Sequence, residues 1–477
     1  MARGKKKESA LTPEEKLAQA LVPVEEQPYK VPENWCWVHL DAVLTEIKNG
    51  TTIKQDKSGD GYSVTRIESL QNQTIDFGRL GNIVDASAIK ETDWYQEGDI
   101  ALSHINSAEH VGKTALITSD MLPLVHGMNL LRLRFDEACL PAFYQYYSQS
   151  FQYKSEILDR INMAVNQVSI NQKQLGSMEF PLPPIKEQQR IVDRIEYLFS
   201  KLEEAKEKAQ SVLDSFETRK AAILHKAFTG ELTAKWREQN ATENSHLQNL
   251  SVSDYISQEE MPCELPLNWQ WIHMGAIGYT NIGLTYKPAD KSETGTIVLR
   301  SSNIQNGQMD YNDIVRVQMA IPENKMCRQG DILICARNGS KSLVGKTAIV
   351  DADGMSFGAF MAIFRSKYNP YIYYFLNSPF FRDLIDKDVG TTTINQVTQA
   401  IIKELAFPFA PENEQDEIVR ILDILFAKEQ QAKEAAEAVL EKIDLLKKSI
   451  LARAFRGELG TNDPTEESAI ELLKNNI

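Results

Sequence analysis

The chain contains one ordered series of short motifs twice. The longest pair is FPLPPIKEQQRIV at residues 180–192 and FPFAPENEQDEIV at residues 407–419. Four further pairs occur in the same order: PENWCW (32–37) with PLNWQW (266–271), EGDIAL (97–102) with QGDILI (329–334), HVGKTALI (110–117) with LVGKTAIV (343–350), and AFTGEL (227–232) with AFRGEL (454–459). Five motifs matching in order indicate a tandem duplication, which predicts two copies of one folding unit.

Each copy begins with a globular part and continues into a helical part. The globular parts mix short β-rich runs, such as YSVTRIESL and TIVLRSSNI, with Gly-, Asn- and Asp-rich turns and with helical segments that start at proline. The expected fold class is therefore α+β, with two mixed α/β domains and long helices. The expected division is an N-terminal segment at 1–32, a first domain at 33–180, a first long helix at 181–232, a linker at 233–262, a second domain at 263–407, a second long helix at 408–460 and a C-terminal segment at 461–477.

The helical part of each copy carries an apolar seam with heptad spacing. In the first copy the seam covers residues 191–223, and only Arg219 interrupts it; in the second it covers residues 418–450, where Glu429 is the one polar residue. A helix of about 40 residues is about 60 Å long and needs a partner to bury such a stripe. Gly230 and Gly457 then occupy the place of a glycine that ends a helix.

The duplication itself supplies a partner for each seam. The two helices would pair antiparallel about a pseudo-twofold axis, which places the two globular domains at opposite ends of a two-helix coiled coil and brings the chain termini together. A coiled coil between two copies of the chain is the alternative, and the sequence leaves it open.

Composition restricts the class of protein. In 477 residues, 42% hydrophobic and 25% charged, no apolar run is long enough to cross a membrane. The basic start MARGKKKESA lacks the apolar segment of a signal peptide. Five cysteines without paired spacing and seven scattered histidines predict reduced thiols in the cytoplasm and no metal site.

Two segments look like catalytic motifs and are better explained by structure. In RNGSKSLVGKT (337–347), five residues separate the two glycines where a phosphate-binding loop needs four, and the equivalent HINSAEHVGKT (104–114) lacks the first glycine. NPYI (369–372) is similar to the Asn-Pro-Pro-aromatic motif of amino-methylating enzymes, but it has one proline only. We therefore expect a chain that is not an enzyme by itself.

The duplicated helix start carries a family resemblance. PPIKEQQRIV (183–192) and APENEQDEIV (410–419), supported by the EGDI/QGDI and VGKTA pairs, resemble the specificity subunit of a type I restriction–modification enzyme. The second copy departs from the pattern by having Ala410 for the first proline. The similarity extends over residues 32–459.

The resemblance implies function, partners and cofactors. Each globular domain would be a target-recognition domain that reads one half of a split double-stranded DNA sequence. The helices would set the distance and dock modification subunits, two of them, and motor–nuclease restriction subunits would join the complex. S-adenosylmethionine would bind the modification subunits, and this chain would bind no cofactor. The location would be the cytoplasm of a prokaryote. A coiled-coil scaffold with two protein-binding domains is the alternative function.

The charge of the two globular parts is low for a protein that binds DNA alone. The net charge of the chain is −14. Residues 266–407 hold 14 Lys/Arg against 12 Asp/Glu, and residues 33–180 hold 12 against 19. Because an autonomous DNA-binding domain usually has a strong basic excess, partner subunits are expected to add phosphate contacts.

Polar and basic residues in turns are the candidates for DNA contact. In the first domain these are Lys54, Lys57, Arg66, Ser103, His104, Asn106, Lys113 and Asn129; in the second they are Lys287, Lys291, Arg300, Asn303, Arg337, Asn338, Ser340, Lys341 and Lys346. Arg and Lys suit guanine edges or phosphates, and Asn suits adenine. Arg66 and Arg300 occupy equivalent places, which favours a shared structural or phosphate role. Arg337, Asn338 and Lys341 have no counterpart in the first copy, which suits a different specificity.

Overall fold

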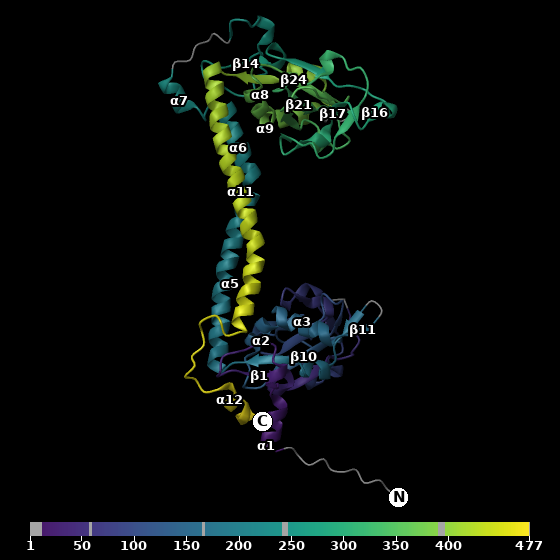
Figure 1. Cartoon of the computed structure of the whole chain (residues 1–477), viewed down its shortest axis with the longest axis vertical. Coiled ribbons are helices and arrows are strands. Elements are labelled where there is room, and N and C mark those ends of the chain that lie inside the picture. The colour runs from purple at the N-terminus through teal and green to yellow at the C-terminus, as the bar shows by residue number, and fades with distance from the viewer. Residues whose placement is uncertain (1–11, 57–59, 165–166, 241–246, 390–395, 477) are drawn as a thin grey trace. The chain divides into compact units, whose positions relative to one another are not determined.

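The computed structural model describes residues 12–56, 60–164, 167–240, 247–389 and 396–476 (Figure 1). Contacts divide the chain into two compact units: unit 1 comprises residues 1–209 with 438–477, and unit 2 comprises residues 210–437. Each unit therefore contains one globular part together with a portion of both long helical segments.

Unit 1 is built around a four-stranded antiparallel sheet in the order β2-β10-β7-β9. Smaller sheets pair β1 with β13, β3 with β6, β4 with β5, and β11 with β12 and β8. The strands are β1 Cys36–His39, β2 Leu44–Asn49, β3 Tyr62–Val64, β4 Leu70–Gln71, β5 Thr74–Ile75, β6 Gly81–Ile83, β7 Ile100–Ser103, β8 Ile105–Asn106, β9 Thr114–Leu116, β10 Leu130–Phe135, β11 Asn162–Ala164, β12 Gln167–Ser169 and β13 Glu179–Leu182. The short helices are α1 Pro13–Ala20, α2 Pro141–Tyr147, α3 Phe151–Arg160, α4 Gln172–Gly176 and α12 Ala469–Asn476.

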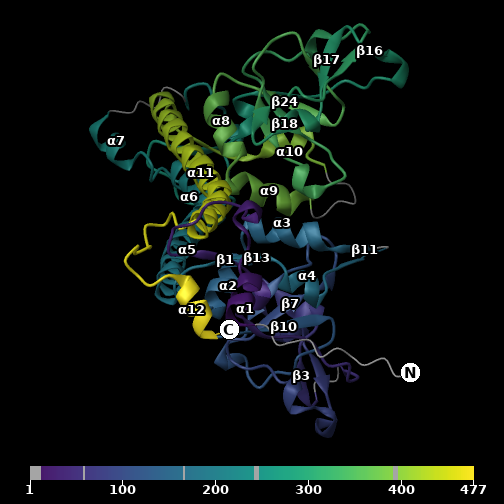
Figure 2. The ribbon, with the colours of Figure 1, turned by 60° about the horizontal axis from the view of Figure 1, so that its bottom comes forward.

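Unit 2 repeats this plan with the four-stranded antiparallel sheet β15-β24-β21-β22. A second four-stranded sheet, β16-β20-β17-β23, lies on the side of unit 2 away from α6 and α11, as Figures 1 and 2 both show. The strands are β14 Gln270–His273, β15 Tyr279–Ile282, β16 Lys291–Ser292, β17 Thr296–Leu299, β18 Ile304–Gln305, β19 Gln308–Met309, β20 Val315–Val317, β21 Ile332–Cys335, β22 Thr347–Ile349, β23 Ser356–Phe357, β24 Met361–Arg365 and β25 Ala406–Phe409. The short helices are α7 Ala234–Gln239, α8 Asn369–Leu376, α9 Pro379–Val389 and α10 Gln399–Glu404.

Paired strands hold the entry and the exit of each globular part together. β1 pairs antiparallel with β13 in unit 1, and β14 pairs with β25 in unit 2. Pro181 lies inside β13, opposite Trp37, so the expectation that the helix region begins at residue 181 places it too early. Proline is tolerated there because each pair is a two-stranded ribbon whose outer edge needs no backbone donor. The helices begin later, α5 at Ile185 and α11 at Glu412.

The core of each unit is closed by a phenylalanine from the end of a long helix. Phe455 lies 5.3 Å from Phe143 and 5.2 Å from Tyr147, measured between ring centroids in unit 1. Phe228 lies 5.2 Å from Tyr371 in unit 2. These residues are buried, and aromatic pairs in edge-on or tilted contact add about 0.5–1.5 kcal/mol each beyond the area that they bury. The AF[TR]GEL motif therefore anchors each long helix in the globular part encoded by the other copy.

The sequence predicts one continuous helix for the first long helical segment, and this is wrong. The segment contains two helices. α5 covers Ile185–Asp214 and α6 covers Phe216–Phe228, with a break at Ser215. The Ser215 hydroxyl donates to the Ser211 carbonyl at 2.5 Å and also accepts a hydrogen bond from Arg219. A serine that bonds to the carbonyl four residues earlier competes with the helix backbone and bends it. The second segment is continuous, as α11 Glu412–Ala454.

The two polar interruptions of the seams pair with each other. In unit 2 the Arg219 guanidinium lies 2.8 Å from the Glu429 carboxylate. In unit 1 the Lys447 ammonium lies 3.4 Å from the Glu203 carboxylate. Within unit 2, Phe216 contacts Lys433 and Lys220 contacts Phe426, so position increases along α6 as it decreases along α11 and the contacts are antiparallel. Both members of the Arg219–Glu429 pair are partly buried, and a charged pair at that place favours this register over neighbouring ones.

One face of α11 is more exposed than the heptad pattern predicts. Ala432, Val439 and Leu446 belong to the predicted seam, yet all three are exposed. Val439 and Leu446 are 40% and 48% exposed, and the adjacent Leu445 is 66% exposed. We call Val439, Leu445 and Leu446 the α11 stripe. A pair of helices covers less of each seam than a larger bundle would, which explains the correction.

The terminal segments and the linker fold onto the units. α1 packs against α12 in unit 1, and the Ala469 amide donates to the Asn34 carbonyl at 3.0 Å. In the linker, α7 follows directly after α6, and Ile256 is buried in unit 2. The described parts of these segments therefore contribute to the two cores.

Candidate nucleic-acid interface

The Glu of the EQ motif has the same role at the start of each long helix, which explains why the chain contains the motif twice. In unit 1 the buried Glu187 accepts a hydrogen bond from the Thr461 hydroxyl at 2.7 Å, just past the end of α11. In unit 2 the buried Glu414 accepts from Thr233 at 2.6 Å, just past the end of α6. Each motif carboxylate therefore holds the start of one long helix to the end of the other. We call these two regions the joints.

The joint of unit 2 is built around Glu414. Its Oε1 also accepts from the Arg237 guanidinium at 2.6 Å, and its Oε2 accepts from the Trp269 indole at 2.9 Å. Trp269 belongs to the PLNWQW motif. Gly230 at the helix end has φ +79°, and a Cβ there would lie 2.4 Å from Pro266 of the same motif. The left-handed backbone and the close approach of proline both require glycine.

The joint of unit 1 keeps the glycine, the proline and the motif carboxylate at equivalent places, but its tryptophan, Trp35, donates to the Asn462 side chain at 3.3 Å instead of to the carboxylate. Gly457 has φ +72°, and a Cβ there would lie 2.4 Å from Pro32. Burial raises the pKa of Glu187, and hydrogen bonds from Thr461 and Arg190 oppose that rise. Gln188 fixes the helix start, because its amide nitrogen donates to the Ala138 carbonyl at 2.8 Å. Three of the five repeated motifs thus act in the joints or the core.

Two turns at one edge of the main sheet bring candidate DNA contacts together in unit 1. β7 and β10 are antiparallel neighbours that pair Ser103 with Leu130. The turn after β7 and the turn before β10 therefore lie side by side, which places His104 next to Asn129. Burial lowers the pKa of His104, opposed by a hydrogen bond with the Asn129 backbone. Asn129 has φ +68°, a left-handed conformation that asparagine tolerates, and Asn106 donates to the Ser103 hydroxyl at 3.1 Å.

The equivalent edge of unit 2 carries different chemistry. The exposed Arg337 lies over the Phe360 ring, with its guanidinium carbon 5.3 Å from the centroid, and Phe360 is 59% exposed. Asn338 donates to the Ser301 hydroxyl at 3.2 Å and accepts from the Ser340 amide at 3.0 Å. Phe360 is not among the residues that the sequence singles out, and no motif marks this position before β24.

Arg66 and Arg300 make the same kind of ion pair at their equivalent positions, and a phosphate contact from either one stays a prediction. Arg66 lies 2.7 Å from the Glu68 carboxylate, and Arg300 lies 2.7 Å from the Asp313 carboxylate. Both guanidinium groups are partly buried. Their charge is paired within the unit.

Two candidates point inward and are corrected. Ser103 and Asn303 are buried. The Asn303 amide donates to the Asp310 and Asp313 carbonyls at 2.8 and 3.0 Å, and its oxygen accepts from the Arg300 amide at 2.9 Å. These groups hold loops together from the interior, so neither side chain reaches a duplex from this position.

The remaining lysines are dispersed. Lys54, Lys287, Lys291 and Lys341 are exposed, and Lys291 lies on β16. Lys57 lies outside the described residues. Lys113 and Lys346, half-buried, precede β9 and β22.

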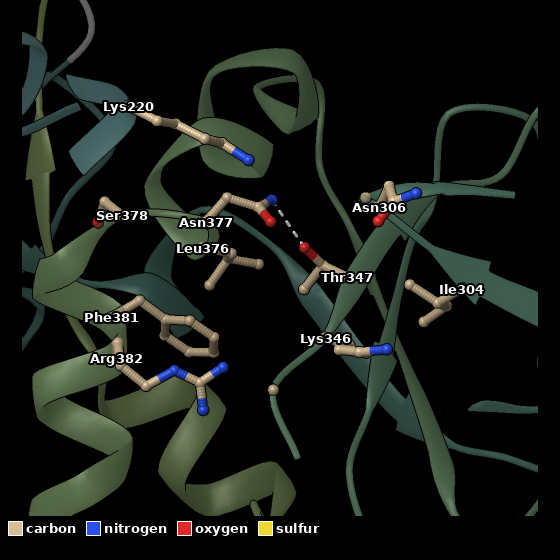
Figure 3. Close-up of a pocket in the computed structure, with 12 residues that line it drawn as sticks. Lys220, Ile304, Asn306, Lys346, Thr347, Leu376, Asn377, Ser378, Phe381 and Arg382 are labelled. Carbon is tan, nitrogen blue, oxygen red and sulfur yellow. Dashed lines mark hydrogen bonds between the residues drawn. The ribbon is translucent and has the colours of Figure 1, made fainter. Parts of the chain in front are cut away.

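Lys346 borders a cavity of about 240 Å³ in unit 2 (Figure 3). Lys220 and Arg382 also line it, as do Thr347 and Asn377, whose side chains share a 2.8 Å hydrogen bond. Among the described residues there is no group of His, Cys, Asp and Glu side chains that could hold a metal ion. Within the same residues, no helix has the length and apolar character needed to span a membrane.

Comparison with known proteins gives a consistent result over most of the chain. The family described as “Type I restriction modification DNA specificity domain” matches residues 32–211 and 266–442. The chain is 28% identical over 429 residues to a specificity subunit assigned to the type I restriction enzyme MjaX of Methanocaldococcus jannaschii, covering 87% of this chain and 92% of the relative.

Two further comparisons cover as much of the chain. It is 24% identical over 450 residues to the type I restriction enzyme StySPI specificity subunit of Salmonella potsdam, covering 90% of both chains. The crystal structure of the HsdS subunit from Thermoanaerobacter tengcongensis superposes with a TM-score of 0.64 at 18% identity, covering 91% of this chain and 100% of that one. That structural likeness concerns the fold.

Proposed function

Because the chain belongs to the type I restriction–modification DNA specificity family, we propose that it reads a two-part DNA target, with one part recognised by each unit. As a specificity subunit the chain is the DNA-recognition component and is not catalytic by itself; methylation and cleavage belong to partner subunits. This membership decides between DNA recognition and the protein-binding scaffold that the sequence left as an alternative.

The observation that carries the two-part reading is the repeated architecture with unlike turns at one place. Unit 1 presents His104 and Asn129 at the edge of its main sheet, and unit 2 presents Arg337 and Phe360 at the equivalent edge. The strand register next to these turns is the same in the two units: Leu130 pairs with Ser103 in unit 1, and Met361 pairs with Cys335 in unit 2. A common scaffold with different exposed side chains suits two readers with different base preferences.

The long helices act as the spacer between the two half-sites. This role is supported by the contacts between the two helical segments in each unit, Arg219 with Glu429 in unit 2 and Lys447 with Glu203 in unit 1. The two seams form one intramolecular coiled coil related by a pseudo-twofold axis, and its length sets the number of base pairs between the two half-sites.

The partners are double-stranded DNA and modification subunits, with restriction subunits joining when cleavage occurs. The two joints are equivalent, which supports two modification subunits, one for each joint. The α11 stripe of Val439, Leu445 and Leu446 offers exposed apolar surface for such a contact. S-adenosylmethionine binds the modification subunits and not this chain.

Replacing Arg337 by alanine tests the assignment of one half-site to each unit. We expect binding selection from random duplexes, with the assembled complex, to relax base preference in one block and leave the other block unchanged. A two-pronged contact from arginine to guanine is worth about 1–3 kcal/mol, or about tenfold to a hundredfold in preference. Arg300→Ala is the matched control, because the Arg300 guanidinium already pairs with Asp313. Relaxation of both blocks together would contradict the assignment.

The free chain is expected to bind DNA weakly. Residues 33–180 hold 12 Lys/Arg against 19 Asp/Glu, so this globular part alone neutralises phosphates poorly. Adding modification subunits should tighten binding by at least tenfold in a titration at fixed salt. Equal affinity of the free chain and the complex would refute this expectation.

A further inference from the structure

The cavity in unit 2 is bordered by residues from several separate elements. Lys220 comes from α6, Lys346 precedes β22, and Arg382 comes from α9 (Figure 3). Asn306 and Gly307, at the tip of the β18–β19 hairpin, complete the lining. Among the described lining residues three carry a positive charge and none carries a carboxylate.

In unit 1 a side chain occupies the equivalent place. The β4–β5 hairpin turns through Asn72 and Gln73, both with positive φ. The Gln73 Oε1 atom lies 3.4 Å from the Thr114 hydroxyl, which donates to it, and 3.2 Å from the Gln145 amide nitrogen. An uncharged acceptor oxygen belonging to the chain itself thus meets the hydroxyl of the GKT motif.

In unit 2 the residue equivalent to Gln73 is Gly307, which has no side chain, and the neighbouring Asn306 borders the cavity. The Tyr373 hydroxyl donates to the Gly307 carbonyl at 2.8 Å, and a Cβ on Gly307 would lie 2.6 Å from that hydroxyl. Thr347 accepts a hydrogen bond from Asn377, which leaves its own hydroxyl proton to donate. Gly307 therefore supplies no side-chain oxygen in the place of the Gln73 acceptor of unit 1.

A lysine that is paired with a carboxylate in unit 1 lacks the equivalent carboxylate in unit 2. In unit 1 Lys447 lies over Phe199 at 5.6 Å and pairs with Glu203, four residues further along the helix. In unit 2 Lys220 lies over Phe426 at 5.9 Å, and the residue four positions further is Gln430. The helix pair of unit 2 thus repeats the stacked lysine of unit 1 but has an uncharged amide at the place of its carboxylate.

The second cation shows a similar contrast. In unit 1 the Lys154 ammonium, at the equivalent place on α3, donates to the carbonyls of Ala108, Glu109 and Val111 at 3.2, 3.0 and 3.1 Å. In unit 2 the Arg382 guanidinium donates to the Val344 carbonyl at 3.2 Å through one nitrogen and borders the cavity. A guanidinium has five N–H donors, so a single carbonyl satisfies a fraction of them.

We propose that this cavity binds a phosphate group. Three cations around a partly enclosed space favour an anion, and charge-assisted hydrogen bonds to phosphate are among the strongest that proteins make. The volume of about 240 Å³ is smaller than pockets for drug-sized ligands, which begin at about 300 Å³, so the anion is compact. Lys220, Arg382 and Lys346 supply charge, and Thr347 supplies a hydroxyl donor.

The phosphate group comes either from a small molecule or from the DNA backbone. A neighbouring groove of about 590 Å³ shares Lys220, Asn306 and Asn377 with the cavity. Its further lining includes the rings of Tyr374 and Phe426, and the charged side chains Lys433, Glu217 and Glu434. The groove has room for the rest of a phosphate ester, so both sources fit the same chemistry.

Titration of the full chain with inorganic phosphate at constant ionic strength tests the proposal. Isothermal calorimetry should show saturable binding at one site, weakened at least tenfold by Lys220→Met, which removes the charge and keeps an apolar stem on Phe426. Lys447→Met, the equivalent change in unit 1, should leave phosphate binding unchanged. Absence of saturable binding in the unchanged chain, or equal loss in both variants, would overturn the proposal.

A second matched pair guards against a folding defect. Lys346→Met should weaken phosphate binding, and Lys113→Met, at the same place in the GKT motif of unit 1, should not. Circular dichroism of all four variants verifies that each is folded.

Duplex DNA separates the two sources. If the group is a DNA phosphate, the duplex displaces inorganic phosphate, and Lys220→Met lowers the slope of log affinity against log salt by about one, whereas Lys447→Met does not. If the group belongs to a small molecule, phosphate and duplex bind together and the slope stays unchanged. In either case the half-site result for Arg337→Ala is independent, so failure here is distinguishable from failure of the proposed function.

Discussion

Replacing Glu414 by alanine is expected to lower the free energy of unfolding of unit 2 by about 3–5 kcal/mol, the usual cost of breaking a buried charged pair. The substitution leaves Arg237, Trp269 and Thr233 without their shared acceptor at the joint. Trp269 and Thr233 are buried, and the Arg237 side chain is 18% exposed, so water replaces little of what is lost. Urea unfolding gives the magnitude, and amide hydrogen exchange in α6 and α7 shows where the protection is lost.

Glu417→Ala is the matched control on the same helix. Glu417 pairs with Arg420, whose side chain is 60% exposed, and such surface pairs contribute less than about 1 kcal/mol. Glu187→Ala in unit 1 should give an intermediate loss, because Arg190 keeps its contact with Glu466 at 2.7 Å. If Glu414→Ala lowered the free energy of unfolding no more than Glu417→Ala does, the stabilising role of the unit 2 joint would be wrong.

Lengthening both long helices by one heptad is expected to widen the gap between the two half-sites by about three base pairs. Seven residues add about 10.5 Å to a helix, and one base step is about 3.4 Å. Whole heptads inserted after Ala209 in α5 and after Ala438 in α11 preserve the seam, because each insertion repeats the apolar spacing. Binding selection with the assembled complex should return the same two blocks with a longer gap. Affinity for the original target should fall by about a thousandfold or more, towards non-specific binding.

Insertion into α11 alone is the control for this experiment. A single insertion cannot satisfy the Arg219–Glu429 pair and the Lys447–Glu203 pair together, so pairing is strained at one end. That variant should lose affinity for every spacing instead of preferring a new one. Selected targets that keep the original gap after insertion into both helices would exclude the spacer role.

Local chemistry made much of the fold predictable from the sequence. The glycines that end the long helices were identified by position, and Gly230 and Gly457 do have left-handed backbones. The seams were visible because heptad spacing is independent of tertiary detail. The same analysis identified Arg219 and Glu429 as exceptions in their seams. Their mutual contact depends on register between segments far apart in sequence, which spacing alone does not supply.

The features that were missed depend on packing between distant segments. The break at Ser215 arises from a side-chain hydrogen bond that competes with the helix, and serine occurs in helices without such breaks. Asn303 was counted as a DNA contact because asparagine in a turn is usually exposed, but two carbonyls from a neighbouring loop bury it. Phe360 lacks any motif of its own. The difference between Gln73 and Gly307 matters because each hairpin packs against a GKT turn, and this packing is known only from the structure.

The antiparallel ribbons β1–β13 and β14–β25 have a consequence for how such proteins diversify. Each ribbon pairs the first strand of a globular part with its last strand. The chain between them therefore begins and ends at neighbouring positions beside the long helices. A globular part of different length and sequence can be joined to the same two strands without moving either long helix. New target preferences can therefore arise by exchange of whole globular parts, while the long helices and the joints stay as they are.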